Sequence, residues 1–403
     1  MTKVTLVTPN ERKYLGNAGD RMPLGVLYLA SALNDADIEN DVVDMNHTHW
    51  LDTIDKIKDE KPDVVGLSLV SSMSYPQMKV LAEEIRPYTD TIVAGGHHVS
   101  ALPHSLDGVV DAVVLGDGEN GIIRVARDGW KGIMRQEFNI NEFPIPDRTK
   151  LDISKYKMEI LGLKTAPMTT MRGCPFSCLF CGNMNSNPKY RDIGNVEEEA
   201  QQLRKMGYEG VYFYNESHTL NPKHAEEVGK VMQRNKLKYR AETRANLIND
   251  DIAEMLSETG CMMVALGIES GDDKVLEAIK KGETTGAMTR AVNTLARHGV
   301  PTKGYFIMGL PEQDLNSGLK SIKYAKDLQS RGMQSADFYA LTPFPGSPIA
   351  EHPENYGIRV TDTNYKHYLE ASKKVRTPVI ETDWLSSQGI KSLIERARLE
   401  WDK

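Results

Sequence analysis

Short runs of β-branched residues alternate with helical patterns along most of this chain, and this alternation limits the possible folds more than any other feature. Strands rich in Val and Ile with helices between them predict parallel βαβ units whose sheet is covered on both faces. In such open sheets, ligands bind beyond the carboxyl ends of the strands. The first third therefore predicts an α/β domain over residues 1–130, with the expected strands "KVTLVTP", "NDVVDM", "DVVGLSLV", "TIVAGG" and "DAVVLGDGE".

A second series of the same kind begins at Lys164, after a less periodic stretch. That stretch, 131–163, includes "EFPIPDRTKLD" with its two prolines and is interpreted as a linker. Six βα repeats resemble a partial form of the eightfold barrel, whose chemistry lies at the carboxyl ends of its strands. We expect this partial barrel over 164–345 and a C-terminal extension over 346–403. Its expected strands are "APMTTM", "GVYFYN", "LKYRAET", "MMVALGI", "TKGYFIMG" and "ADFYALT".

The composition narrows the class of protein. Of the 403 residues, 40% are hydrophobic and 26% are charged, as in globular proteins. A net charge of −7 gives no basic footprint, so a nucleic-acid partner is not expected. The start of the chain has no signal-peptide pattern, and no uncharged run approaches the roughly 18 apolar residues of a membrane helix. Four cysteines do not make a disulfide framework, so we expect a cytoplasmic protein without a transmembrane segment.

Three of the four cysteines lie close together in "RGCPFSCLFCGN", as Cys174, Cys178 and Cys181. They follow the first expected strand of the second series, and cysteine thiolates are the usual ligands of iron–sulfur clusters. A three-cysteine loop leaves the fourth iron of a cubane open for a substrate or cofactor. A structural zinc site instead needs four ligands and a second pair at matching spacing, whereas Cys261 heads an apolar strand as a core residue. The loop therefore favours a [4Fe-4S] cluster over zinc or a chance grouping.

This loop resembles the cluster-binding loop of radical S-adenosylmethionine (SAM) enzymes, and the resemblance extends through the second series. In that family the open iron chelates the methionyl amino and carboxylate groups of SAM, and one electron from the cluster cleaves SAM to methionine and a 5′-deoxyadenosyl radical. The resemblance implies that the three cysteines are the cluster ligands and that Phe180 packs near the adenine.

Later strand ends also resemble family signatures, in "YFYNESHTLN", "YRAETRANL", "ALGIESGDDKVLEAIKKG" and "GYFIMGLPEQ". The first implies that Glu216 binds the methionyl ammonium, although Asn215 stands where relatives commonly have an acid. The second offers partners for the carboxylate and ribose, and the third places an acid and a serine in the barrel mouth. A charged strand end is more often solvated or paired structurally, so the order of the motifs carries the argument. The implied SAM-binding residues are Phe180, Glu216, Glu242, Arg244, Asn246, Glu269 and Ser270.

The first domain resembles the Rossmann-like cobalamin-binding domain that precedes the radical barrel in one large subgroup. A Ser-x-Leu stretch and a Gly-Gly turn let the backbone approach the nucleotide tail of cobalamin, a task suited to glycine. The cobalamin contacts that the resemblance implies are Ser68, Leu69, Ser71, Gly95, Gly96 and His97. No histidine is expected under the cobalt, because "DMNHTH" has Asp44 but places Asn46 where the cobalamin motif has its histidine. The alternative is that the domain is inherited with this fold but binds no corrin.

Together the two domains imply a cobalamin-dependent methyltransferase that acts on an unactivated carbon or on phosphorus. Relatives with the same architecture support ring formation, ring contraction and oxidative cyclisation, and nothing in the sequence separates these outcomes. A cluster or cobalamin sensor without turnover is a third hypothesis, which the SAM-binding residues argue against. The resemblance also implies a flavodoxin- or ferredoxin-type electron donor, and the substrate is left open among a small metabolite, a lipid precursor and a peptide.

Overall fold

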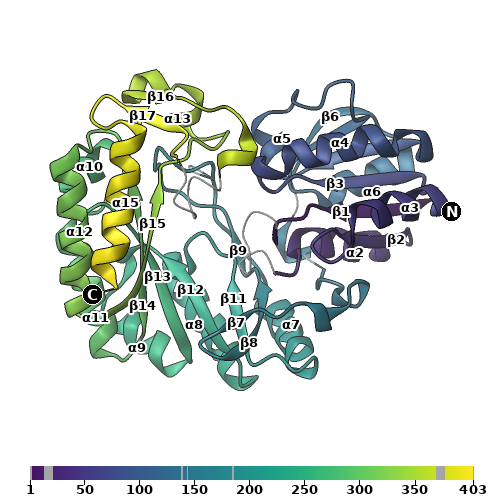
Figure 1. Ribbon diagram of the computed structural model, residues 1–403. Helices are drawn as coiled ribbons and strands as arrows, with labels where there is room; N and C mark the ends of the chain where they lie inside the picture. The colour runs from purple at the N-terminus through teal and green to yellow at the C-terminus, as the bar shows by residue number, and fades with distance from the viewer. Residues whose placement is uncertain are drawn as a thin grey trace. The chain divides into compact units, whose positions relative to one another are not determined.

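The chain forms two compact units, Met1–Met158 and Glu159–Lys403, in the computed structural model shown in Figure 1. The structure describes residues 2–12, 21–137, 139–142, 144–183, 186–368 and 377–402. The boundary between the units falls inside the stretch 131–163 that the sequence predicts as a linker. The predicted α/β class is confirmed for both units.

The first unit is built on a six-stranded sheet in the order β2-β1-β3-β4-β5-β6, and every neighbouring pair is parallel. Five of these strands match the sequence-based prediction. The sixth lies in the predicted linker, where its mostly exposed residues give no apolar run to recognise. The strands are β1 (Lys3–Thr8), β2 (Glu39–Asp44), β3 (Val64–Ser68), β4 (Thr91–Gly95), β5 (Ala112–Gly116) and β6 (Gly132–Gln136).

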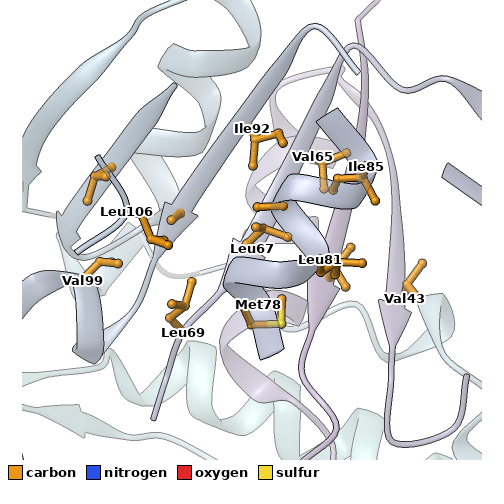
Figure 2. Close-up of a cluster of buried hydrophobic side chains, with 14 of the residues drawn as sticks. Val43, Val65, Leu67, Leu69, Met78, Leu81, Ile85, Ile92, Val99 and Leu106 are labelled. Carbon is orange, nitrogen blue, oxygen red and sulfur yellow. The ribbon is translucent and has the colours of Figure 1, made fainter. Parts of the chain in front are cut away.

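Helices cover both faces of this sheet. On one face, α2 (Leu24–Asp35) and α6 (Glu119–Asp128) contribute Val26, Leu33 and Ile122 to a buried cluster. On the other face lie α3 (Trp50–Glu60), α4 (Tyr75–Ile85) and α5 (His97–Ala101). Figure 2 shows α4 laying its apolar side chains against strand residues such as Leu67 and Ile92. Each fully buried aliphatic side chain stabilises the fold by about 1.5 to 3 kcal/mol, so this double coverage fixes the strand ends that carry the predicted cobalamin residues.

Gly96, which follows β4, sits where only glycine fits. Its φ of +109° and ψ of −178° lie in a region that is essentially reserved for glycine. A Cβ atom there would lie 2.7 Å from the carbonyl carbon and oxygen of Leu69. This close approach is held by two backbone hydrogen bonds, from Leu69 N to Gly95 O at 2.8 Å and from His98 N to Leu69 O at 3.0 Å.

We expect Gly96→Ala to lower the free energy of unfolding by about 2 to 4 kcal/mol, because backbone strain and overlap with Leu69 add. Urea unfolding followed by circular dichroism measures the change. Gly108→Ala is the matched control, because Gly108 also has a positive φ (+74°) but has no atom within 4 Å of its added Cβ. The control should lose only about 1 kcal/mol, and equal losses for both variants would contradict the packing explanation.

The second unit contains a seven-stranded sheet in the order β15-β14-β13-β12-β11-β8-β7. All neighbouring pairs are parallel except β7 with β8. The six predicted barrel strands are all present. They are β8 (Leu163–Met168), β11 (Gly210–Phe213), β12 (Lys238–Thr243), β13 (Cys261–Glu269), β14 (Thr302–Met308) and β15 (Met333–Ala340), and β7 (Glu159–Ile160) is added at the edge.

Helices between the strands form a layer against one face of this sheet, as Figure 1 shows. Their starts follow from local sequence, because Asp192, Asn221, Asn249, Thr284 and Asp314 each cap a helix by accepting a backbone N–H. The layer consists of α7 (Ile193–Lys205), α8 (Pro222–Arg234), α9 (Asp250–Glu258), α10 (Asp273–Ala278), α11 (Thr285–Arg297) and α12 (Leu315–Ser330).

The C-terminal extension completes this helix layer. Helix α15 (Ser387–Trp401) packs against α12 and β15, so closely that a Cβ added at Gly318 would lie 2.4 Å from Leu393. The rest of the described extension contains α13 (Pro348–Glu351) and the antiparallel pair β16 (Ile358–Val360) and β17 (Ile380–Thr382). Three of the predicted SAM residues, Glu216, Arg244 and Glu269, lie at or just after the carboxyl ends of β11, β12 and β13.

Candidate active site

The three-cysteine loop follows β8 and is closed at its base by a short hairpin. Strand β9 (Met171–Arg172) pairs antiparallel with β10 (Lys189–Tyr190). Gly173 enters the loop with a φ of +94°, and a Cβ there would lie 2.4 Å from the carbonyl oxygen of Asn187. Inside the loop, Cys174 N donates to Ser186 Oγ at 2.8 Å. The hairpin and the contacts of Gly173 and Cys174 therefore hold the two ends of the loop together.

The backbone that leads into this loop is fixed by Asn215, at the end of β11. Its Oδ1 accepts hydrogen bonds from Thr170 N at 2.9 Å and from Met171 N at 3.3 Å. Its Nδ2 donates to Thr170 Oγ1 and to the Nδ1 of His218, at 2.8 and 3.1 Å. Asn215, which stands where relatives commonly have an acid, thus holds the base of the cysteine loop.

His218 is fully buried beside Asn215, and burial lowers its pKa to about 3. Its ring stacks on Phe213 with 4.8 Å between centroids. An unfolded histidine takes up a proton near pH 6.5, whereas the folded one does so only near pH 3. The unfolded state therefore binds more protons between these values, and stability is lost as the pH falls through this window.

We expect His218 to contribute about 1.4 kcal/mol of lost stability for each pH unit below about 6. Urea unfolding at pH 7, 6 and 5 measures the slope, and His218→Leu should make it shallower by that amount. His104→Leu is the control, because the side chain of His104 is 76% exposed. A slope unchanged in His218→Leu would contradict a neutral buried histidine.

A second buried network holds the same backbone from the other side. Arg191, directly after β10, donates to the carbonyl of Thr169 at 2.7 Å and to Glu199 of α7 at 2.6 Å. The side chains of Arg191 and Glu199 are both 0% exposed. Because a buried charge is stable only when it is paired and hydrogen-bonded, this pair is part of the loop's foundation.

Each of the three cysteine thiols could serve one iron of a cubane cluster, because cysteine thiolates are the usual ligands of such clusters. Burial raises the pKa of Cys174 and Cys181, and the neighbouring thiols raise it further. These thiols therefore release protons when a metal binds. Cys261 is buried in the core, as predicted, and burial raises its pKa to about 12.

Glu216 places a carboxylate beside this loop, as the sequence predicts. It interacts electrostatically with Cys174 and accepts a backbone hydrogen bond from Gly173. Burial raises the pKa of Glu216, and hydrogen bonds from the backbone and the charge of Arg172 oppose the rise. Its Oε2 is buried and has no hydrogen-bond partner among the residues that the structure describes. An ammonium group would satisfy this oxygen, so Glu216 fits the methionyl end of SAM.

Four buried charged residues form ion pairs near the loop, and we call them the charge cluster: Arg244, Glu269, Lys281 and Glu283. Arg244 donates to Cys178 Sγ at 3.4 Å and pairs with Glu283 at 3.3 Å. Lys281 Nζ lies 2.9 Å from Glu269 and 3.6 Å from Glu283. Two of the predicted SAM residues, Arg244 and Glu269, are therefore already held in ion pairs.

The other predicted SAM residues are distributed around this centre. Glu242 lies in β12, two residues before Arg244. Its Oε1 accepts hydrogen bonds from Tyr212 Oη at 2.6 Å and from Tyr305 Oη at 3.2 Å. The hydroxyls of these tyrosines thus join a polar network instead of only packing in the core. Ser270 is buried and shares a hydrogen bond with Ser321 of α12. Asn246 is exposed and Phe180 is half-buried.

In the first unit, the predicted cobalamin residues gather at the ends of β3 and β4. Ser68 pairs with Gly95, and a Cβ added at Gly95 would meet only the carbonyl oxygen of Val114, at 3.8 Å. The side chain of Leu69 is buried in the core (Figure 2), so it offers a ligand only its backbone.

Of the remaining predicted cobalamin residues, one makes a structural hydrogen bond and the other is exposed on the surface. Ser71 accepts a hydrogen bond from Met73 N at 3.3 Å, while His97 is exposed at the start of α5. Asp44 accepts a hydrogen bond from Tyr156 Oη at 2.5 Å, and Asn46 Oδ1 accepts one from Arg12 N. The end of β2 is thus tied to other parts of its own unit.

Family models match both units. A model of the Radical SAM superfamily matches residues 168–325, and a model of the B12 binding domain matches residues 17–126. The chain belongs to the radical SAM enzymes that carry a B12-binding domain. This membership confirms the predicted cofactors, with cobalamin for the first unit and a [4Fe-4S] cluster with SAM for the second. The contacts of individual side chains with them stay predictions.

Known proteins resemble this B12-binding radical SAM enzyme over most of its length. An uncharacterized methyltransferase of Pyrococcus horikoshii is 29% identical, covering 99% of this chain and 92% of that protein. An anaerobic magnesium-protoporphyrin IX monomethyl ester cyclase of Rubrivivax gelatinosus is 26% identical, covering 91% and 71%. The radical SAM methyltransferase TsrM of Kitasatospora setae, solved with cobalamin and a [4Fe-4S] cluster, superposes with a TM-score of 0.71 at 18% identity, covering 89% and 80%. This last likeness establishes the fold.

Sequence reasoning missed Lys281, Glu283 and the Arg191–Glu199 pair of this radical SAM enzyme. Lys281 and Glu283 stand in "KKGE", directly after a short helix that the pattern did not predict. The only indication in the sequence was that two charged residues, Lys281 and Glu283, flank a glycine. Arg191 and Glu199 are eight positions apart across a helix start, and nothing in their spacing distinguishes them from a solvated pair.

In the described part of the chain, no helix is long and apolar enough to cross a membrane.

Proposed function

We propose that this protein is a cobalamin-dependent radical SAM methyltransferase that acts on an unactivated carbon or phosphorus centre. The observation that carries the proposal is the unpartnered, buried Oε2 of Glu216 beside the three-cysteine loop. It supports a site that binds SAM at the cluster, in a chain that also carries a B12-binding domain. The methyltransferases among its relatives support methyl transfer as the outcome.

The residues divide the work as follows. When bound, the cluster and cobalamin supply the one-electron cleavage of SAM and the carriage of a methyl group. Cys174, Cys178 and Cys181 would hold the cluster, and Glu216 would orient SAM by accepting hydrogen bonds from its ammonium group. The polar network around Glu242 would offer hydrogen-bond partners to a substrate. A flavodoxin or ferredoxin is the proposed electron donor, and a small metabolite, a lipid precursor or a peptide is the proposed substrate.

Ring formation without methyl transfer is the second candidate. The cyclase from Rubrivivax gelatinosus favours it, since that relative covers 91% of this chain at an identity close to that of the methyltransferase. Both candidates use SAM as a radical source, and they differ in whether a second SAM gives up its methyl group. The products of SAM therefore distinguish them.

The test begins with anaerobic reconstitution with iron, sulfide and hydroxocobalamin, followed by iron and cobalt counts after desalting. The loaded protein is then incubated with dithionite, SAM labelled with deuterium in its methyl group, and a small-molecule extract. A methyltransferase should form both 5′-deoxyadenosine and S-adenosylhomocysteine, with a new product that carries the label. 5′-Deoxyadenosine with an unlabelled new product would favour the cyclase, and no 5′-deoxyadenosine at all would exclude both.

A further inference from the structure

The charge cluster brings two cations and two carboxylates into the interior of the second unit, and all four side chains are at most 8% exposed. They come from three places, namely Arg244 after β12, Glu269 at the end of β13, and Lys281 and Glu283 after α10. Buried charges are costly even when paired. An arrangement that gathers four of them against one loop therefore calls for a role in what that loop holds.

The backbone of β13 is distorted so that Glu269 meets Lys281. The register between β13 and β14 shifts at Gly267 and Glu269, as in a β-bulge. Glu269 has a φ of +61°, which is uncommon for a residue with a side chain. A Cβ at Gly267 would lie 2.4 Å from Glu269 Oε1 and 2.8 Å from Lys281 Nζ, so the ion pair occupies the space over this glycine. The local structure is thus arranged around the pair.

The charge cluster is held against the cysteine loop. The backbone N–H of Leu179, next to Cys178, donates to the carbonyl of Ile279 at 3.0 Å and holds the segment before Lys281 against the loop. Arg244 links the two, because it donates to Cys178 Sγ at 3.4 Å and to the carbonyl of Lys281. Burial alone would lower the pKa of Lys281, but the carboxylates of Glu269 and Glu283, 2.9 and 3.6 Å from its Nζ, outweigh burial, and the pKa stands above its ordinary value. Lys281 therefore keeps its proton and its charge.

We propose that Lys281 sets the reduction potential of the cluster, because its buried positive charge stabilises the added electron. The inference rests on the proposed function, since it requires the three cysteines to hold a [4Fe-4S] cluster. Reduction brings one electron from an external reductant and adds one negative charge at the cysteine loop, with no bond made or broken in the protein. A fixed cation in a dry site favours that added charge more strongly than one in water. Glu269 has a supporting role, in which it keeps the ammonium in place.

The test is a redox titration of the reconstituted protein, monitored by electron paramagnetic resonance at fixed pH, with titanium(III) citrate as reductant. Lys281→Met should retain about four irons per chain, but its equilibrium constant for reduction should fall about tenfold, which is 59 mV for a one-electron couple. Lys281→Arg keeps the charge and should stay within about threefold of the wild type. Lys280→Met is the matched control, because the neighbouring Lys280 is exposed, and it should titrate as the wild type does.

The outcomes separate the two proposals. A wild-type protein that takes up no four-iron cluster would overturn the proposed function itself. A wild-type protein with its cluster, together with a Lys281→Met variant of unchanged potential, would overturn only the role of Lys281. If Lys281→Met loses the cluster, the double variant Lys281→Met/Glu269→Gln removes both charges of the pair. A smaller decrease in potential would then support the inference, and an unchanged or higher potential would refute it.

Discussion

Replacing Cys178 by alanine should leave the reconstituted protein without the visible absorption of a [4Fe-4S] cluster and without any 5′-deoxyadenosine above the background of the reductant. Cys178 is the most buried of the three loop cysteines and the one that Arg244 contacts, at 3.4 Å. Its loss would leave two thiolates for a cubane and an unpartnered guanidinium donor at the site. The same complete loss is expected for Cys174→Ala and Cys181→Ala, because the loop offers no fourth cysteine as a substitute.

Cys261→Ala is the control for this prediction. Cys261 is buried at the start of β13, and burial raises its pKa to about 12, so it is a thiol of the core. The variant should keep about four irons per chain and form 5′-deoxyadenosine at the wild-type rate, with a small loss of stability from the removed sulfur. Iron and sulfide analysis with the visible spectrum measures the outcome. A Cys178→Ala protein that still holds four irons would refute the ligand assignment.

The sequence predicted most strands of both sheets because they are short runs rich in β-branched, aromatic or apolar residues between helical patterns. It missed β6, whose residues are mostly exposed, and α10, whose six residues are too few to show a helical period. The cysteine loop was also readable, because its three ligands are neighbours in the chain. These successes share one cause: the deciding contacts are local, or they repeat at a regular spacing.

The surroundings of the loop could not be read in the same way. Arg244 and Glu269 were predicted as SAM contacts from their positions at strand ends, but only the fold shows that Lys281 and Glu283 reach them. Similarly, Asn215 appeared as a departure from the usual acid, and its hydrogen bonds to the backbone of Thr170 depend on two adjacent strands. Such pairings are set by tertiary structure. Charged residues at strand ends therefore indicate where a site lies, but they do not indicate which side chains or ligands each of them contacts.

Breaking the buried Arg191–Glu199 pair should produce the largest loss of stability among single substitutions near the site. Glu199→Ala leaves the guanidinium of Arg191 buried without its carboxylate, a change that typically costs about 3 to 5 kcal/mol. Urea unfolding at pH 7 measures it. Glu226→Ala is the matched control on α8, because Glu226 pairs with Lys230 where the two side chains are 47% and 53% exposed. The control should change stability by less than about 1 kcal/mol.

A double variant separates the pair's contribution to stability from its hold on the cysteine loop. In Arg191→Met/Glu199→Leu no buried charge is left unpaired, so most of the lost stability should return. The carbonyl of Thr169 nevertheless loses the donor that Arg191 supplies at 2.7 Å, two residues before Met171 leads into the loop. Iron uptake should therefore stay below that of the wild type even when the unfolding curve has recovered. Recovery of both would mean that Asn215 and the β9–β10 hairpin fix the loop without Arg191, and recovery of neither would mean that the site cannot be packed with apolar side chains.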